Sequence, residues 1–173
     1  MEDSVVSAER PALEALENAG IDYIRISHPQ AVTMELCRGI GAEYGAAHCK
    51  NLFLTNKRGD DFRLLLMDPE KPFRTSEVSR ALGVTRMSFA SEESLGRVMG
   101  LVPGAVTVMG LVNASAKKAY EEGRLHIVID EDLFRRERIC VHPNHSGASL
   151  VLKTEDLPKL IRSLGYEAKV IRI

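Results

Sequence analysis

Apolar residues recur along the chain at the two spacings that are typical of helices and of strands. Helical spacing over residues 7–19 predicts an opening helix, with Ser7 as its cap and Pro11 in its first turn. The same spacing, bounded by capping residues and glycines, predicts further helices over residues 34–40, 75–82, 92–99, 114–122 and 155–164. Helices are therefore expected throughout the chain rather than in one part of it.

Strands are predicted between these helices. Residues 50–54 and 62–67 are apolar segments separated by the turn 57–60, which predicts an antiparallel hairpin. The unbroken apolar run 52–54 indicates a strand that is buried on both faces. Further strands are predicted over residues 21–26, 87–89, 105–109, 125–129, 139–141, 148–152 and 166–173. Because strands and helices intermingle without a linker or repeat, residues 1–173 are expected to form a single mixed domain, either α/β or α+β.

The composition is that of an ordinary globular protein. The 173 residues are 27% charged and 45% hydrophobic, and the net charge is −1. This charge argues against a polycation that coats nucleic acid, and the lack of tryptophan argues against an aromatic platform for single strands. No apolar run is long enough to cross a membrane, and residues 2–3 are acidic, so we expect a cytoplasmic protein without a secretory signal.

The sequence offers few signals of metal, covalent or nucleotide chemistry. Cys140 and His142 lie two apart, with His145 close by and His48 elsewhere, but the two ligand pairs of a typical zinc site are missing. The three cysteines are more typical of small buried side chains in a reducing compartment than of disulfides. No G-x-S-x-G elbow and no phosphate-binding glycine loop occurs. Neither a metal nor an organic cofactor is therefore predicted.

Lys50 stands at the start of the most apolar strand, and two interpretations of it are open. A lysine at a strand end can simply extend to water. It can also place a fixed positive charge at the rim of a pocket, directed at a phosphate or a carbonyl oxygen. His142 has the same ambiguity, because a histidine at a strand end is either an ordinary polar residue or part of a pocket.

The order of five short motifs resolves this ambiguity. The chain contains, in sequence, His28-Pro29 with Thr33, Lys50-Asn51-Leu-Phe-Leu, Ser88-Phe-Ala-Ser, Gly100-Leu-Val-Pro-Gly104-Ala-Val-Thr through Gly110-Leu, and His142-Pro-Asn. This series resembles the YbaK/ProX aminoacyl-tRNA deacylase family over nearly the whole chain. Within the family, the chain is most similar to the freestanding editing proteins that act on mischarged prolyl-tRNA.

The resemblance implies a fold, a reaction and a partner. The implied fold is α+β, with a mixed, barrel-like sheet flanked by helices. The implied reaction is hydrolysis of the ester that joins a wrong amino acid to the 3′-terminal ribose of a tRNA, most closely alanine on tRNA for proline, without a cofactor. The implied partner is the acceptor end of that tRNA, and prolyl-tRNA synthetase is a second candidate partner. The oligomeric state stays open.

The resemblance also assigns roles to residues. In this assignment Lys50 contacts the substrate end, Asn51 supports it, and His142 lines the amino-acid pocket. The segment from Gly104 to Gly110 supplies backbone N–H groups at the reacting carbonyl, where such donors stabilise the developing oxyanion. The implied catalytic residues are thus Lys50, His142, Gly104 and Gly110, and the implied substrate-binding residues are Asn51, His28, Thr33 and Ala105.

Two positions depart from the family pattern and keep alternatives open. Ser146-Gly147 stands where the family commonly has an Asn-Thr pair, and Val108 stands where it often has a proline. These departures bear on amino-acid specificity more than on reaction class. A non-catalytic module that binds tRNA or prolyl-tRNA synthetase is the main alternative, and hydrolysis of another small acyl ester or amide is a weaker one.

Overall fold

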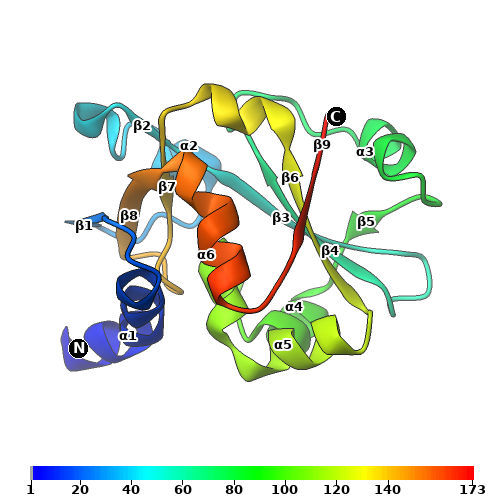
Figure 1. The fold of residues 1–173 in the computed structure, drawn as a ribbon, viewed down its shortest axis with the longest axis horizontal. Coiled ribbons are helices and arrows are strands. Elements are labelled where there is room, and N and C mark those ends of the chain that lie inside the picture. The colour runs from blue at the N-terminus through cyan, green and yellow to red at the C-terminus, as the bar shows by residue number, and fades with distance from the viewer. Residues whose placement is uncertain (1) are drawn as a thin grey trace.

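Two β-sheets form the framework of the protein (Figure 1). The computed structural model describes the backbone of residues 2–173 and the side chains of residues 7–173. The first sheet has the order β1-β8-β7-β2, with β1 at Ile24–Ser27, β8 at Ala148–Lys153, β7 at Arg138–Val141 and β2 at Ala46–His48. The second has the order β5-β3-β4-β6-β9, with β5 at Ser88–Phe89, β3 at Lys50–Thr55, β4 at Phe62–Met67, β6 at Leu125–Asp130 and β9 at Ala168–Ile171.

The pairing confirms the α+β class and the predicted hairpin. Strands β3 and β4 pair antiparallel from Lys50 opposite Met67 to Thr55 opposite Phe62. Strands β4, β6 and β9 run parallel, so the second sheet is mixed. The sheets do not close into a barrel, because β1, β2, β5 and β9 each have a neighbour on one side alone. The expected barrel-like sheet is thus two open sheets.

One continuous stretch of chain passes from the first sheet to the second. Strand β2 ends at His48 and β3 begins at Lys50, so that Cys49 alone separates them. The Cys49 amide still donates to Cys140 O of β7 at 2.9 Å, and the chain then joins β4. Residues on either side of this crossing therefore lie where the two sheets meet.

Helices cover the sheets as the apolar spacing predicts, with differences at their ends. They are α1 (Glu2–Asn18), α2 (Met34–Cys37), α3 (Thr75–Leu82), α4 (Glu92–Met99), α5 (Ala114–Glu121) and α6 (Leu157–Ser163), with short 3-10 turns η1 (Ala42–Tyr44), η2 (Val108–Val112), η3 (Glu131–Arg135) and η4 (Thr154–Asp156). Helix α1 begins before Ser7, so Pro11 lies inside it rather than in its first turn. Helix α2 ends before residue 40, because Gly39 and Gly41 adopt left-handed conformations.

The strand predicted over residues 105–109 is wrong. The structure has a loop there, followed by the 3-10 turn η2. Thr107 caps this turn by accepting a hydrogen bond from the Met109 amide at 3.2 Å. The Val108 amide donates to Asn51 Oδ1 at 3.0 Å, so a side chain takes the place of a strand partner. This apolar segment can form a loop instead of a strand because polar side chains accept hydrogen bonds from its backbone amides.

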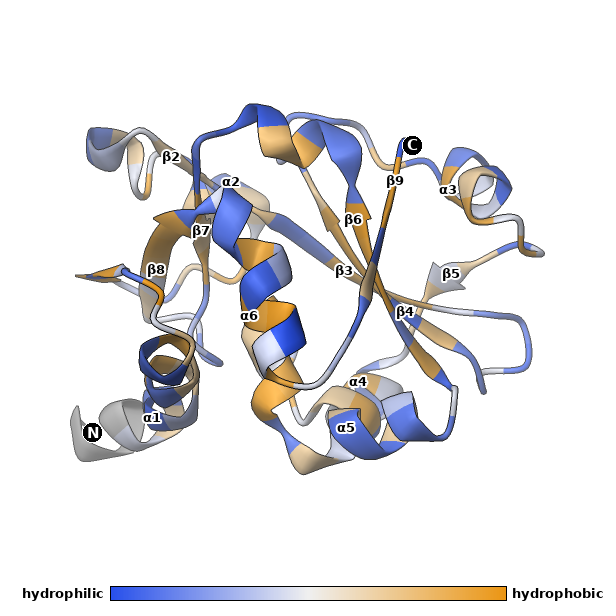
Figure 2. Ribbon diagram, viewed as in Figure 1, coloured by the Kyte–Doolittle hydropathy of each residue, from blue (hydrophilic) through white to orange (hydrophobic). Residues whose placement is uncertain are grey.

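Apolar side chains fill both faces of the second sheet, as the run 52–54 predicts. Phe53 belongs to the main core, where its ring stacks on that of Phe62 at 5.3 Å between centroids. Leu54 faces a smaller core that includes Val78 of α3 and Met87. Figure 2 shows hydrophobic residues along parts of β4 and β6 and hydrophilic stretches on the helices around the sheets. Because side chains alternate along a strand, Lys50 shares the face of Leu54, whereas Asn51 shares that of Phe53.

An ionic cluster attaches α1 to the first sheet. The buried Glu9 carboxylate accepts hydrogen bonds from Arg25 Nη2 of β1 at 2.6 Å and from His145 Nε2 at 2.5 Å. These bonds lower the pKa of Glu9 in spite of its burial, so the carboxylate is ionised near neutral pH.

Among the described residues, no helix is both long and apolar enough to cross a membrane.

Candidate active site

A small cavity lies where the two sheets meet. Its volume is about 200 Å³, and its walls come from α2, β2, β3, the loop before η2 and the end of β7. Four predicted site residues line it, namely Thr33, Asn51, Gly104 and His142. The tertiary structure therefore brings together residues from four separate motifs of the sequence.

Asn51 and Thr107 connect the walls of this cavity. Asn51 donates from Nδ2 to Cys49 O at 3.1 Å and accepts from the Val108 amide through Oδ1 at 3.0 Å. Proline has no N–H group, so the valine at position 108 makes this second bond possible. Thr107 donates from Oγ1 to His142 O at 2.7 Å. Together these side chains hold the loop before η2 against both β3 and the end of β7.

Gly104 allows two loops to approach each other closely at the cavity. Its φ is +81°, a conformation that side chains with a Cβ rarely adopt. A Cβ atom at this position would lie 2.6 Å from Cβ of Val32, so glycine is required by contact as well as by conformation. Among the described residues, no backbone or side-chain group accepts a hydrogen bond from the Gly104 amide. This N–H group is thus unpaired within the described structure, in a residue that lines the cavity.

A group of polar side chains forms the inner wall. His142 is buried, and its Nδ1 lies 2.9 Å from Ala148 O, which can only accept a hydrogen bond. Nδ1 therefore carries the proton of the neutral ring, and Nε2 is left with a lone pair that faces Cys37 Sγ at 3.7 Å. Ser149 Oγ lies 2.9 Å from His48 Nε2 and 2.8 Å from His28 Nε2, so it bridges these two rings.

Burial keeps two of these imidazoles neutral. Desolvation lowers the pKa of His48 from 6.5 to about 3, and the neighbouring His142 and His28 lower it further. Desolvation also lowers the pKa of His142. The cavity wall is therefore uncharged near neutral pH and can only bind a ligand through hydrogen bonds, apolar contact or lone pairs.

The buried His48 predicts a pH dependence of stability. The unfolded imidazole takes up a proton below pH 6.5 and the folded one only near pH 3, so the unfolded state binds more protons between these values. The free energy of unfolding should thus fall as the pH decreases through this window, by up to about 1.4 kcal/mol per pH unit from this group. Urea unfolding at several pH values measures the slope.

A variant separates His48 from the other titrating groups. His48→Gln should reduce the slope, whereas His126→Gln, which changes a half-exposed histidine far along the second sheet, should retain it. An unchanged slope in His48→Gln would contradict the assignment.

Lys50 does not join the other predicted site residues. It is half-buried, and its Nζ donates to Lys71 O at 2.5 Å, in the loop after β4. Burial lowers the pKa of Lys50, while the nearby Asp68 opposes this shift. Its side chain leaves β3 on the face opposite to Asn51, and it is not among the residues that line the cavity. The ammonium group thus lies outside the cavity, on the other face of β3 from Asn51.

Three other predicted residues also lie outside the cavity lining. The Gly110 amide donates to Thr107 O at 3.1 Å and the residue packs on Leu101, so this N–H is not a free oxyanion donor, contrary to the implied role. Ala105 is buried, and its amide donates to Val102 O. His28 lies behind the polar wall, with its Nε2 2.8 Å from Ser149 Oγ and its ring centroid 6.2 Å from that of His142.

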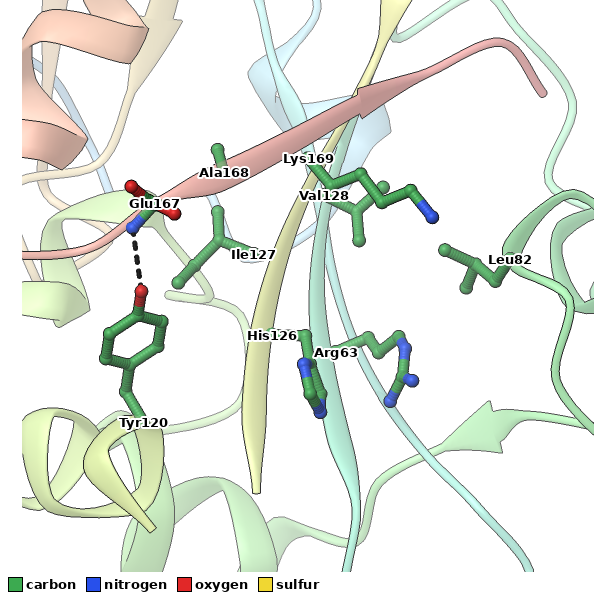
Figure 3. Close-up of a pocket in the computed structure, with 9 residues that line it drawn as sticks. All are labelled: Arg63, Leu82, Tyr120, His126, Ile127, Val128, Glu167, Ala168 and Lys169. Atoms are coloured by element: carbon green, nitrogen blue, oxygen red, sulfur yellow. Dashed lines mark hydrogen bonds between the residues drawn. The ribbon is translucent and has the colours of Figure 1, made fainter. Parts of the chain in front are cut away.

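The described structure has a hollow of about 230 Å³ that shares Asn51, Gly104 and Val106 with the cavity, and two much larger ones. One of about 680 Å³ adjoins the cavity, because Met34, Cys37 and His48 line both, and Arg38 and Arg136 also face it. The other, of about 500 Å³, lies beside β9 (Figure 3). No predicted site residue lines this second hollow, and its arginine and histidine, Arg63 and His126, already pair with Asp61.

Sequence reasoning missed Cys37, His48, Thr107 and Ser149 as residues of the site. Three of them stand alone in their segments, so no local spacing marks them. Thr107 lies inside the recognised glycine motif, and its polar side chain in an otherwise apolar run was a usable signal.

Comparisons with known proteins give the same assignment as the motif order. The family model of the aminoacyl-tRNA editing domain matches residues 28–160. The prolyl-tRNA editing protein ProX of Acetoanaerobium sticklandii is 30% identical over 168 residues, which cover 97% of this chain and 99% of that protein. The prolyl-tRNA synthetase associated domain-containing protein 1 of Bos taurus is 22% identical over 84% of each chain.

A solved structure has the same fold. A crystal structure provisionally named a trans-editing enzyme for prolyl tRNA synthetase superposes with a TM-score of 0.68, at 17% identity, over 96% of this chain and 97% of its own. The family match spans the segments that build the cavity, from His28 to beyond His142. This chain therefore belongs to the aminoacyl-tRNA editing domain family, whose reaction is the deacylation of mischarged tRNA.

Proposed function

We propose that this protein removes alanine from mischarged tRNA for proline, with the aminoacyl ester bound in the cavity between Asn51, Gly104 and His142. The observation that carries the proposal is the unpaired Gly104 amide at the wall of a cavity of about 200 Å³, in a chain of the editing family. So small a space suits a short amino-acid side chain together with part of the terminal ribose.

The chemistry needs no covalent nucleophile, because an aminoacyl ester is already activated. Water attacks the carbonyl carbon, the bond to the ribose oxygen breaks, and the proton passes to that oxygen, which releases free amino acid and tRNA. In this proposal the Gly104 N–H donates to the oxyanion that forms on attack, which its lack of another acceptor supports. The neighbouring ribose hydroxyl of the substrate positions the water, as the family resemblance implies.

The wall around His142 sets the amino-acid specificity in this proposal. The ring is fixed by Ala148 O on one side and faces Cys37 on the other, so it cannot move away from a larger side chain without losing a buried hydrogen bond. Ser146 and Gly147 support the same wall through their carbonyls, which accept from the amides of Ala31 and His28. At the two positions that depart from the family pattern, backbone carbonyls therefore make the hydrogen bonds that support the wall.

Lys50 has a binding role rather than a place at the carbonyl in this proposal. In this proposal the ammonium group, which donates to Lys71 O on the face of β3 opposite to Asn51, binds a terminal phosphate of the acceptor end. A lysine can leave a backbone carbonyl for a phosphate, because the phosphate is the stronger acceptor. Transfer RNA is the macromolecular substrate, prolyl-tRNA synthetase is a proposed second partner, and the cytoplasm, where tRNA is charged, is the proposed location.

A panel of mischarged tRNAs tests the proposal. Alanine on tRNA for proline should be released well above the spontaneous rate, while proline on the same tRNA should stay attached. No release of any small mischarged amino acid would refute a deacylase. Tight binding of uncharged tRNA without turnover would instead support the non-catalytic module, and turnover that free tRNA does not inhibit would indicate a small acyl ester as the substrate.

A further inference from the structure

The inner wall of the cavity holds three potential metal ligands from three separate segments. Cys37 ends α2, His48 ends β2 and His142 follows β7. All three side chains are buried, and one ligand atom from each lies within 4.8 Å of the other two. Spacing along the sequence could not reveal this set, because the residues are far apart in the chain.

The ligand atoms have the chemistry and nearly the spacing of a zinc site. Tetrahedral zinc with sulfur and nitrogen ligands places those atoms about 3.5 Å apart. Cys37 Sγ and His142 Nε2 are 3.7 Å apart, and closing the set needs a movement of about 1 Å. Such a movement is available to the Cys37 side chain, which lies in a four-residue helix that begins and ends in loops.

The surroundings of His142 are those of a metal-binding histidine. Zinc-bound imidazoles usually donate their second N–H to a carbonyl or carboxylate, which fixes the lone pair toward the metal. His142 makes this bond from Nδ1 to Ala148 O, and its Nε2 faces the thiol. The Nε2 atom of His48 already has a hydrogen-bond partner, Ser149 Oγ at 2.9 Å. A metal would have to compete with this hydroxyl for the nitrogen.

We propose that Cys37, His48 and His142 bind one zinc-class divalent cation, with the fourth position open to the cavity. Binding replaces the proton of the Cys37 thiol with the metal, so one proton is released and affinity rises with pH. Of the residues considered as zinc ligands from sequence spacing, His142 and His48 belong to the set, whereas Cys140 and His145 do not. Cys140 Sγ faces Ile40 O at 3.6 Å, and His145 is held by Glu9.

Cobalt titration of the full chain tests the site without any tRNA. The protein is first treated with a chelator and dialysed, and Co²⁺ is then added while the absorption spectrum is recorded. We expect one Co²⁺ per chain, a thiolate-to-cobalt band in the near ultraviolet and the intense visible bands of tetrahedral cobalt. Zn²⁺ should displace the Co²⁺ and remove these bands.

Matched variants make the result specific. Cys37→Ser should lose the thiolate band and weaken binding more than about tenfold, whereas Cys140→Ser, which changes an equally buried cysteine, should keep both. His142→Asn gives a second test if Cys37→Ser does not fold, and it should also weaken binding. A parent protein without the thiolate band at saturating Co²⁺, or a Cys37→Ser variant that retains it, would overturn the site.

A second measurement connects the site to the cavity and rests on the proposed function. An ion at this wall would occupy space assigned to the aminoacyl group, so Zn²⁺ should inhibit deacylation and a chelator should restore it. Deacylation in chelator alone tests the proposed function separately. Cobalt binding together with unchanged activity in Zn²⁺ would show that the metal site and the substrate cavity are not shared.

Discussion

Lys50→Ala is expected to lower kcat/KM for deacylation by about 10²-fold, the loss typical of one charged or oxyanion contact to the substrate. The fold should remain, because the side chain gives up one half-buried hydrogen bond, to Lys71 O, worth about 1 kcal/mol. Single-turnover kinetics with mischarged tRNA measure the effect, and urea unfolding measures the stability.

The kinetic pattern of this variant locates the ammonium group during the reaction. A rise in KM with little change in kcat indicates uniform binding, as expected for a phosphate contact beside the cavity. A fall in kcat instead places Lys50 at the reacting carbonyl. Lys57→Ala, which changes an exposed lysine in the hairpin turn, is the control and should act like the parent. Full activity in Lys50→Ala would remove Lys50 from the site.

Gly104→Ala is expected to lower kcat by about 10²-fold, because a displacement near 1 Å at a reacting group has an effect of that size. The new Cβ would lie 2.6 Å from Cβ of Val32, so the loop must move away and carry the free amide with it. The positive φ also strains alanine, at a cost of about 1–2 kcal/mol in the free energy of unfolding.

Gly59→Ala separates the two effects of that substitution. Gly59 has φ +71°, close to that of Gly104, but an added Cβ would meet nothing within 4 Å. The Gly59→Ala variant should therefore show a similar loss of stability and retain the activity of the parent. If Gly104→Ala kept the kcat of the parent, the amide at residue 104 would not be the oxyanion donor.

The regular elements were largely predictable, because their signals are local. The hairpin of β3 and β4 followed from two apolar segments and a turn, and the burial of both faces of β3 followed from the run 52–54. The segment 105–109 was not predictable by the same rule. It is as apolar as a strand, but its amides bond to two polar side chains: Asn51, which lies outside the run, and Thr107, which lies in the middle of it.

The site was predictable in part. Asn51, Gly104, Thr33 and His142 were identified by motif order and do line one cavity. Lys50 was assigned to the site with Asn51 by the family resemblance, yet neighbouring residues on a strand point to opposite faces. The crossing at Cys49 decides which face each one joins, and no local pattern shows that crossing.

The sequence by itself determined the class of fold, the positions of most helices and strands, and membership in the editing family. These features depend on residue propensities, apolar spacing and the order of motifs, all of which can be seen in the sequence. The tertiary structure alone decided that two open sheets meet at Cys49, that the Gly104 amide is free while that of Gly110 is not, and that Cys37, His48 and His142 share one wall. Those facts depend on contacts between residues far apart in the chain, because packing and hydrogen bonding act through space.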